Sequence, residues 1–415
     1  MNMHVARHDG FDGADLTRLV VCVAIPVKDE EERIAECLKA LAKAERFARR
    51  HVDVRSVTLL LNNCTDRTRD VVTAMAPRLP FPVALVEVLL PPERANAGVA
   101  RRLAADHAAL MLKRVSQCGA ILITDADSRV RRDWFRAHAK AFAQGADAVA
   151  GTVSIDPADF ARWPPDLRRR ERSEMHYGAL LSWIGHFIDP DPIDPWPRHD
   201  QASGASLGVT FRAYEISGGI PEVRLGEDRA FVARLKARGL RVRHCPDVRV
   251  VTAGRFLGRA RGGAAETISR RASDGGAPCD ARMESVADAV RRYRLRRRLR
   301  NSHERLKTAR GGTTCFPSLW QAIEDAHPRL MKTPISPAQL TGEIKRARAL
   351  LRSLAASRPT PDIQAVANGL SGLHLAREGR NHLAEHGGGG IAAQRIVGCA
   401  GIMHHHEIAP AIKTV

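Results

Sequence analysis

The chain has 415 residues, 44% of them hydrophobic and 27% charged, a composition typical of a globular protein with two or three domains. No apolar stretch reaches the ~18 residues of a membrane-spanning helix, and residues 1–18 lack the apolar core of a secretory signal. Its eight cysteines form no Cys-x-x-Cys pair, which favours a reducing cytoplasm over a disulfide framework or a zinc site.

The net charge of +19 indicates an anionic partner or a solvated basic surface. Seven arginines fall within the ten residues Arg291–Arg300. This run predicts either a solvated helix face or peripheral contact with an anionic membrane at its inner face. Nucleic acid is not expected, because no helix-turn-helix, zinc-finger or RNP-like pattern accompanies the charge.

Strand-like and helix-like runs alternate through the first part of the chain. Buried strands are predicted at 20–25, 57–61, 83–90, 120–124 and 148–155. Helices are predicted over 29–50, 67–75, 97–115 and 132–143. This rhythm is typical of an open parallel sheet with helices on both faces.

The pattern changes after residue 155. A helix is predicted over 166–187, and the alternate prolines of 189–198 predict an extended surface loop. The core pattern resumes over 204–263. Farther on, Ser336, Pro337 and Gln339 predict the capped start of a helix. We therefore expect a tail at 1–18, a domain at 19–265 with halves at 19–155 and 156–265, a basic helical extension at 266–386, and a tail at 387–415 containing His404–His406.

Two carboxylates, Asp125 and Asp127, follow the strand predicted at 120–124. Side chains at a strand end lie at the rim of the sheet, where they can hold a hard divalent cation against a diphosphate. The same pattern also occurs in ordinary turns and helix caps, so it gains meaning only with other segments.

Three such segments lie at neighbouring positions. The first strand leads into Pro26, Lys28, Asp29 and Glu30, and the second into Asn62 and Asn63. In a parallel sheet these ends border the ligand crevice, although helix capping would explain the same residues. A basic helix start with Asn96 and Arg101 is suited to phosphate or base contact, or is an ordinary helix start.

Together these segments resemble family 2 glycosyltransferases. The resemblance rests on 25–31 (IPVKDEE), 62–68 (NNCTDRT), 96–102 (NAGVARR) and Asp125–Asp127, and continues through 204–212, 218–221 and 226–231. It covers about 19–265. It implies the GT-A fold, a mixed and mainly parallel sheet flanked by helices, with transfer of a sugar from a nucleotide donor to an acceptor hydroxyl.

The resemblance also implies roles for individual residues. Asp127 would hold Mg²⁺ or Mn²⁺, Asp125 would contact the nucleoside, and Asp228 would be the general base beside Glu227, giving a single displacement with inversion. The remaining donor-side residues would be Pro26, Lys28, Asp29, Glu30, Asn62, Asn63, Asn96, Arg101, Arg255 and Arg259. The acceptor-side residues would be Gly204, Ala205, Ser206 and Trp183.

The sequence departs from the family pattern in two places. Many relatives carry Asp where Asn62 or Asn63 stands, so the base of the donor stays open among UDP, GDP and dTDP. The Gln-x-x-Arg-Trp motif of processive members is missing, and Arg255 and Arg259 stand in a segment that could close over the diphosphate. This favours a single transfer. His244 is either a second metal ligand or, as we expect, an exposed strand histidine.

Two other functions compete with this one. A nucleotidyltransferase that makes nucleotide sugars would need a Gly-rich phosphate loop after the first strand, where this chain has Pro26–Glu30. A non-catalytic module anchored by its basic extension would bind anionic vesicles and turn over no nucleotide sugar. The acceptor is not identified, although aromatic residues of 163–197 could stack on a sugar.

Overall fold

The computed structural model describes residues 18–115, 118–259, 263–310 and 315–356. The described residues up to Leu351 belong to one compact unit, and the few that follow belong to a second. The tails predicted at 1–18 and 387–415, with His404–His406, lie outside the described residues apart from Arg18.

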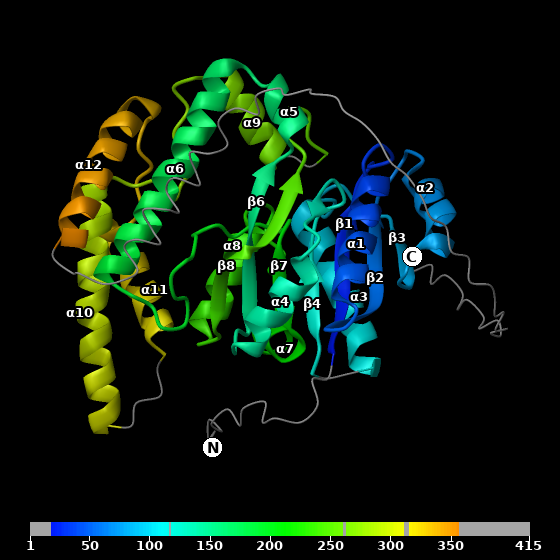
Figure 1. Cartoon of the computed structure of the whole chain (residues 1–415), viewed down its shortest axis with the longest axis horizontal. Helices are drawn as coiled ribbons and strands as arrows, with labels where there is room; N and C mark the ends of the chain where they lie inside the picture. The colour runs from blue at the N-terminus through cyan, green and yellow to red at the C-terminus, as the bar shows by residue number, and fades with distance from the viewer. Residues whose placement is uncertain (1–17, 116–117, 260–262, 311–314, 357–415) are drawn as a thin grey trace, which may run out of the picture. The chain divides into compact units, whose positions relative to one another are not determined.

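One eight-stranded sheet forms the centre of this unit, in the order β3-β2-β1-β4-β7-β6-β8-β5 (Figure 1). The strands are β1 (Leu19–Val27), β2 (Val52–Asn62), β3 (Val83–Val88), β4 (Ala120–Ile123), β5 (Arg129–Val130), β6 (Ala148–Ile155), β7 (Leu207–Thr210) and β8 (Val242–Thr252). Strands β1 to β4 pair in parallel, as do β6 and β8.

The two antiparallel members of this mainly parallel sheet are β7 and β5. Strand β7 lies antiparallel between β4 and β6, and β5 pairs antiparallel with β8. The sequence of a four-residue apolar strand does not indicate whether it pairs in parallel or antiparallel, because its side chains alternate between the two faces in both cases. The mixed, mainly parallel sheet implied by the family resemblance is what the structure contains.

Helices cover both faces of the sheet and continue beyond it. They are α1 (Ile34–Ala48), α2 (Thr68–Met75), α3 (Ala97–Val115), α4 (Trp134–Ala143), α5 (Pro157–Arg162), α6 (Pro165–Ile188), α7 (Phe211–Ser217), α8 (Glu227–Ala237), α9 (Ala264–Ser273), α10 (Val286–Arg310), α11 (Phe316–Ala326) and α12 (Pro337–Ala356), with short 3-10 turns at Ala76–Arg78 and Pro328–Leu330.

Each face of the sheet has its own hydrophobic cluster. One cluster packs α1 and α4 against the sheet, and the other packs α3, α7 and α8 against the opposite face. The alternation of buried side chains along β1 explains this arrangement, because Val21, Val23 and Ile25 join the first cluster while Cys22 and Ala24 join the second.

The first strand was predicted to end at residue 25, before Pro26, but Pro26 lies inside β1, opposite Leu60 of β2. A proline lacks the N–H that a central strand needs. Here the pairing of β1 with β4 ends at Ala24, so β1 has a strand neighbour on only one side at this position. The missing donor therefore breaks no ladder bond.

Several boundaries follow the predictions closely. Helix α3 and strand β6 have the predicted limits, and 189–198 contains no helix or strand. The predicted cap of α12 is present, with the Gln339 side chain accepting the Ser336 N–H at 2.8 Å. Helix α1 begins at Ile34 rather than 29, after a turn in which Glu30 accepts from Arg33 and Ile34.

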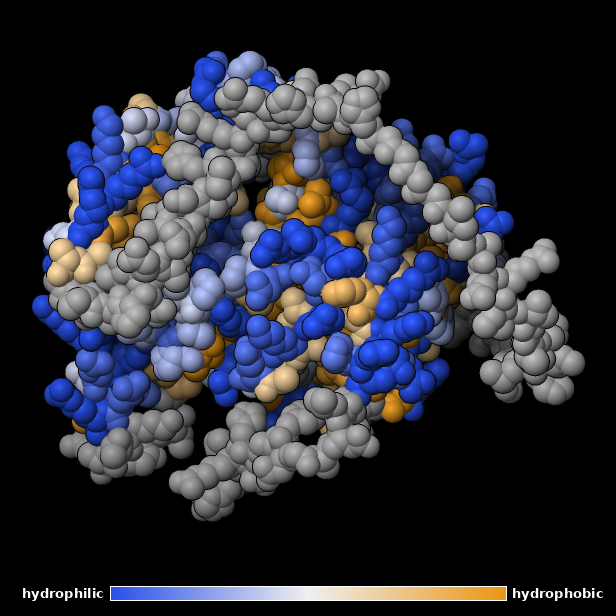
Figure 2. Space-filling view, viewed as in Figure 1, coloured by the Kyte–Doolittle hydropathy of each residue, from blue (hydrophilic) through white to orange (hydrophobic). Residues whose placement is uncertain are grey.

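Among the described residues no helix is long and apolar enough to cross a membrane. Figure 2 shows hydrophilic residues over much of one face, with hydrophobic patches between them. Helices α6, α10 and α12 lie together beyond β8 in Figure 1, and α10 and α6 are in direct contact.

Candidate active site

The loops after β1 and β2 are tied to each other by side chains. Asp29 accepts the Thr65 N–H at 2.7 Å and lies 3.1 Å from the Lys28 ammonium group. Lys28 also donates to the Asn63 carbonyl. Asp29 and Asn63 both have positive φ, 50° and 52°, which short polar side chains tolerate best. These residues therefore build the rim of the crevice before any ligand binds.

The asparagines of the predicted donor site have local roles of their own. The Asn63 side chain exchanges two hydrogen bonds of 2.9 Å with the backbone of Leu90. Asn96 accepts the Val99 N–H at 3.1 Å at the start of α3. Asn62 is buried, and its side-chain oxygen has no partner among the described residues. Of the three, Asn62 has the free acceptor.

Arg101, on α3, joins carboxylates from both halves of the domain. Its guanidinium group lies 2.7 Å from Asp125, beyond the end of β4, and also pairs with Glu227, at the start of α8. A Cβ atom on Gly204 would collide with this guanidinium group. The glycine is therefore required by the close approach of the arginine.

Asp127 is paired with Arg255, in the segment that follows β8. The guanidinium group lies 2.5 Å from Asp127 and also binds Glu30, so that it bridges the two carboxylates. Burial raises the pKa of Glu30 to about 7 against the opposing effect of Arg255. Burial, followed by the charge of Asp125, also raises the pKa of Asp127.

The charges of Asp127 and Asp228 both act on the guanidinium group of Arg101. Burial alone would lower the pKa of Arg101, but nearby carboxylates raise it above its usual value, and these belong to Asp125, Asp228 and Asp127. Asp228 itself accepts the N–H groups of Gly204 at 3.1 Å and Arg229 at 2.7 Å. Gly204, which the Arg101 guanidinium group also approaches closely, thus links the predicted base to Arg101.

The two carboxylates at the start of α8, those of Glu227 and Asp228, differ in their exposure to solvent. Glu227 is buried and bound to Arg101. Asp228 is only partly buried, and backbone N–H groups hold its orientation. A general base must reach its substrate, so Asp228 rather than Glu227 has the required position.

The residues around Asp127 fit a hard divalent cation. Four carboxylates, those of Glu30, Asp125, Asp127 and Glu227, pair with only two guanidinium groups, those of Arg101 and Arg255, which leaves an excess of negative charge among these six groups. All the nearby acidic donors are oxygen atoms, which Mg²⁺ and Mn²⁺ prefer. Burial is the first cause of the upward shift in the pKa of Glu30 and Asp127, and the neighbouring carboxylates add to it.

A second group of potential ligands lies in the loops after β1 and β2. Within the described ranges, Asp29, Cys64 and Asp66 place one ligand atom each within 4.8 Å of the others. Each also takes part in hydrogen bonds between the two loops, as in the Cys64 thiol to the Val27 carbonyl at 3.5 Å. The structure accounts for these three residues without an ion.

The predicted acceptor-side residues are placed differently from one another. Gly204 contacts Asp228 directly. Ala205 and Ser206 are buried, and the Ser206 hydroxyl accepts from Trp134 at 3.5 Å. Trp183, on α6, stacks on Trp196 with ring centroids 5.6 Å apart and planes 10° apart. Arg259 is exposed, and its charge acts on Glu30.

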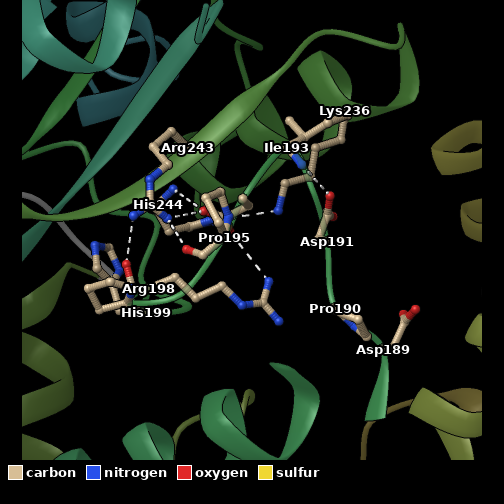
Figure 3. A network of polar contacts seen from close by, with 12 residues as sticks. Asp189, Pro190, Asp191, Ile193, Pro195, Arg198, His199, Lys236, Arg243 and His244 are labelled. Carbon is tan, nitrogen blue, oxygen red and sulfur yellow. Dashed lines mark hydrogen bonds and ion pairs between the residues drawn. The ribbon is translucent and has the colours of Figure 1, made fainter. Parts of the chain in front are cut away.

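The expectation that His244 is an exposed strand histidine was wrong. It is buried on β8, where its ring Nδ1 and backbone N–H bind Asp194 at 2.7 and 2.9 Å. Figure 3 shows the loop from Asp189 to Arg198 lying against this strand. Burial lowers the pKa of His244, and it lowers that of neighbouring Lys236 to about 8. Sequence separation hid this network, since Asp194 lies 50 residues away.

Sequence reasoning also missed the hydroxyl groups that hold Asp127. Thr252, the last residue of β8, donates to it at 3.1 Å, and Ser128 lies at 3.4 Å. A second missed contact joins Arg33 to Asp159 at 3.0 Å, and Asp159 also accepts the Gly254 N–H at 2.9 Å. Only the proximity of Thr252 to Arg255 in the chain could have pointed to the first of these.

Several solved structures are similar to this chain. The mannosyltransferase PcManGT from Pyrobaculum calidifontis, in complex with GDP-Man and Mn²⁺, is 19% identical over 88% of this chain and 83% of its own, with a TM-score of 0.41. TarS of S. aureus is 16% identical over 57% of this chain and only 35% of its own, with a TM-score of 0.35. Glucosyl-3-phosphoglycerate synthase from Mycobacterium tuberculosis is 13% identical over 63% of this chain and 83% of its own, with a TM-score of 0.35.

None of these TM-scores reaches 0.5, so nothing about function follows from them, and no curated protein matches the chain. A family model does match: Glycosyl transferase family 2, over residues 22–206. That segment contains β1 from Cys22 onward, β2 to β6, both loops of the crevice rim and the Asp125–Asp127 pair. Residues 22–206 thus match glycosyl transferase family 2, and the sheet is the mixed, mainly parallel sheet expected from the sequence for a GT-A fold.

Proposed function

We propose that this protein transfers a sugar from a nucleoside-diphosphate sugar to an acceptor hydroxyl, with inversion and with a divalent cation. The proposal rests on one observation above all. Asp125 and Glu227, from the two halves of the domain, both bind the guanidinium group of Arg101, and the charges of Asp127 and Asp228 act on the same group.

In this reaction the acceptor hydroxyl gives its proton to the Asp228 carboxylate as its oxygen attacks the anomeric carbon. The bond from that carbon to the donor diphosphate breaks in the same displacement, which inverts the configuration. Gly204 and Arg229 hold Asp228 in place through their N–H groups.

The leaving diphosphate needs positive charge. A divalent cation held by Asp127 supplies part of this charge when bound. Arg255 supplies another part by moving its pairing from Glu30 and Asp127 to the phosphates, and exposed Arg259 is near enough to assist. The base and ribose would lie against the rim of Lys28, Asp29, Asn62 and Asn63.

Two substitutions test this assignment of roles. Asp127→Ala is expected to abolish Mn²⁺-dependent binding of the nucleotide sugar, measured by calorimetry. Asp228→Asn is expected to keep donor binding and to lower turnover by about 10²–10⁴-fold, the usual range for loss of a general base. Full turnover by the Asp228→Asn protein would overturn the role of that residue.

A control and a donor panel complete the experiment. Asp247→Asn changes an exposed aspartate that is 3.8 Å from Arg249 on the surface, and its activity should match the unaltered protein. Thermal-shift measurements with UDP-, GDP- and dTDP-sugars, with and without Mn²⁺, would identify the donor base.

A further inference from the structure

A groove lined by basic side chains lies between α1 and the segment that links β5 to α4. Its volume is about 400 Å³. Lys39, Lys43 and Arg46 line it from α1, and Arg129 and Arg132 line it from the other side. The only acidic side chain in this lining is Glu36, which already binds Lys39 at 2.8 Å.

The groove concentrates like charges. Lys39, Lys43 and Arg46 fall on one face of α1, where like charges four residues apart destabilise a helix. Across the groove, the Arg132 guanidinium group lies 4.4 Å from the centre of the Phe47 ring, which fixes its direction. Lys43 and Arg46 make no ion pair within the part of the chain that the structure describes. A bound anion would relieve this repulsion.

The groove continues toward the candidate active site. A second cavity, of about 260 Å³, shares Glu36 and Arg129 with the first and has Asp127 in its wall. However, α1 and α4 cover the opposite face of the sheet from α3 and α8, which carry Arg101 and Glu227. The basic groove is thus separate from the general base.

We propose that this groove binds a small phosphate-bearing molecule. Its volume lies in the range of small-molecule sites, and basic side chains stand on both of its walls, where one phosphate group can accept from several of them. Figure 1 shows α1 and α4 on the same side of the sheet, and Figure 2 shows hydrophilic residues on this face in the same view.

The test uses the full chain and inorganic triphosphate, with EDTA present so that no divalent cation takes part. The double variant Lys43→Ala/Arg46→Ala should bind triphosphate at least about tenfold more weakly by calorimetry, as expected when two charge-assisted contacts are lost. The matched control Arg294→Ala/Arg298→Ala removes two exposed cations from α10 and should bind as the unaltered protein does. All four positions are exposed, so both variants are expected to fold, and circular dichroism checks this.

Three results would overturn the proposal. The first is that the unaltered protein does not bind triphosphate. The second is equal affinity in the groove variant and the control, or loss of affinity in Arg255→Ala alone, which would place the triphosphate at the donor site. The third is loss of binding to phosphatidylserine vesicles in the groove variant without any triphosphate binding, which would make the groove a membrane contact.

Discussion

Arg101 connects parts of the chain that lie far apart in sequence. It is buried, and it pairs with Asp125 and with Glu227, which is 126 residues away. Removing one partner of a buried ion pair leaves an uncompensated charge, which costs far more than an exposed pair contributes. The position of the carboxylates therefore depends on this one side chain.

Arg101→Met is expected to lower the free energy of unfolding by about 3–5 kcal/mol, because Asp125 and Glu227 lose their cation. Urea denaturation measures this loss. Arg101→Lys keeps the charge but loses the paired geometry of the guanidinium group. Its free energy of unfolding should therefore lie between those of Arg101→Met and the unaltered protein. A methionine variant as stable as the unaltered protein would show that the carboxylates do not need the guanidinium group.

His138 makes the stability depend on pH. Its ring is fully buried, Nδ1 bonds the Trp134 carbonyl at 3.0 Å, and burial lowers its pKa to about 4. The folded state keeps the ring neutral while the unfolded state gains a proton below about pH 6.5. The free energy of unfolding should therefore fall as the pH drops from about 6.5 toward 4, by up to ~3 kcal/mol from this residue.

Urea denaturation at pH 7.5 and pH 5 tests the effect. The pKa of His199 is lowered to about 3 by burial, and that of His244 is also lowered, so both add a loss of the same sign. His138→Leu should consequently show a smaller drop between the two pH values than the unaltered protein. An unchanged drop would assign the effect to other groups.

At the scale of single elements, the arginines of α10 fall on two faces, one that forms ion pairs and one that is exposed. Arg292, Arg296 and Arg300 follow one another at four-residue intervals. Arg292 pairs with Glu284, and the other two pair with Asp189, at 3.5 and 3.0 Å, beyond the end of α6. Burial raises the pKa of Asp189, whose side chain is only 1% exposed. This face of α10 holds the proline-rich loop in place.

The double variant Arg296→Ala/Arg300→Ala should lose about 3–5 kcal/mol of unfolding free energy, since it leaves the Asp189 carboxylate buried without a cation. Arg294→Ala/Arg298→Ala changes exposed arginines of the same helix and should stay within about 0.5 kcal/mol of the unaltered protein. Equal urea midpoints for the two variants would contradict the division of faces.

The membrane contact predicted for Arg291–Arg300 can accordingly use only the arginines that α10 leaves exposed. Of the seven arginines, Arg291, Arg294 and Arg298 are exposed. A peripheral contact remains a proposal that would have to use these three. Its signature would be vesicle binding that weakens with salt and is lost when the three are replaced.

At the scale of the whole molecule, buried carboxylates link α6 to the helices that follow the sheet. Glu343 of α12 accepts the Val286 N–H at 2.8 Å and lies 3.5 Å from the Tyr177 hydroxyl of α6. Glu174 of α6 pairs with Arg271 of α9 at 3.1 Å. Contacts of this kind place α9, α10 and most of α12 in the same compact unit as the sheet.

A chain that ends at Gly263 should therefore unfold at a melting temperature more than about 10 °C lower, because Glu174 would lose Arg271 and Tyr177 would lose the Glu284 carbonyl. A chain that ends at Ala356 keeps every described contact and should melt with the full protein. Differential scanning calorimetry compares the three. Equal melting temperatures would show that the sheet and α6 need no helices beyond residue 263.

Local sequence determined the elements and the position of the acidic pair. Apolar runs and helical periodicity located the strands and helices, and Asp125–Asp127 fell at the end of β4 as predicted, because these signals act over a few residues. The capped start of α12 was equally readable, since Ser336 and Gln339 are three residues apart.

Only the tertiary structure decided the direction of β7, the place of Pro26 inside β1, the burial of His244 and the pairing of Arg255 with Asp127 and Glu30. Arg255 lies 128 residues from Asp127 and 225 from Glu30. No local pattern specifies contacts at such distances, because they form only when packing of the sheet and its helices brings the strand ends together.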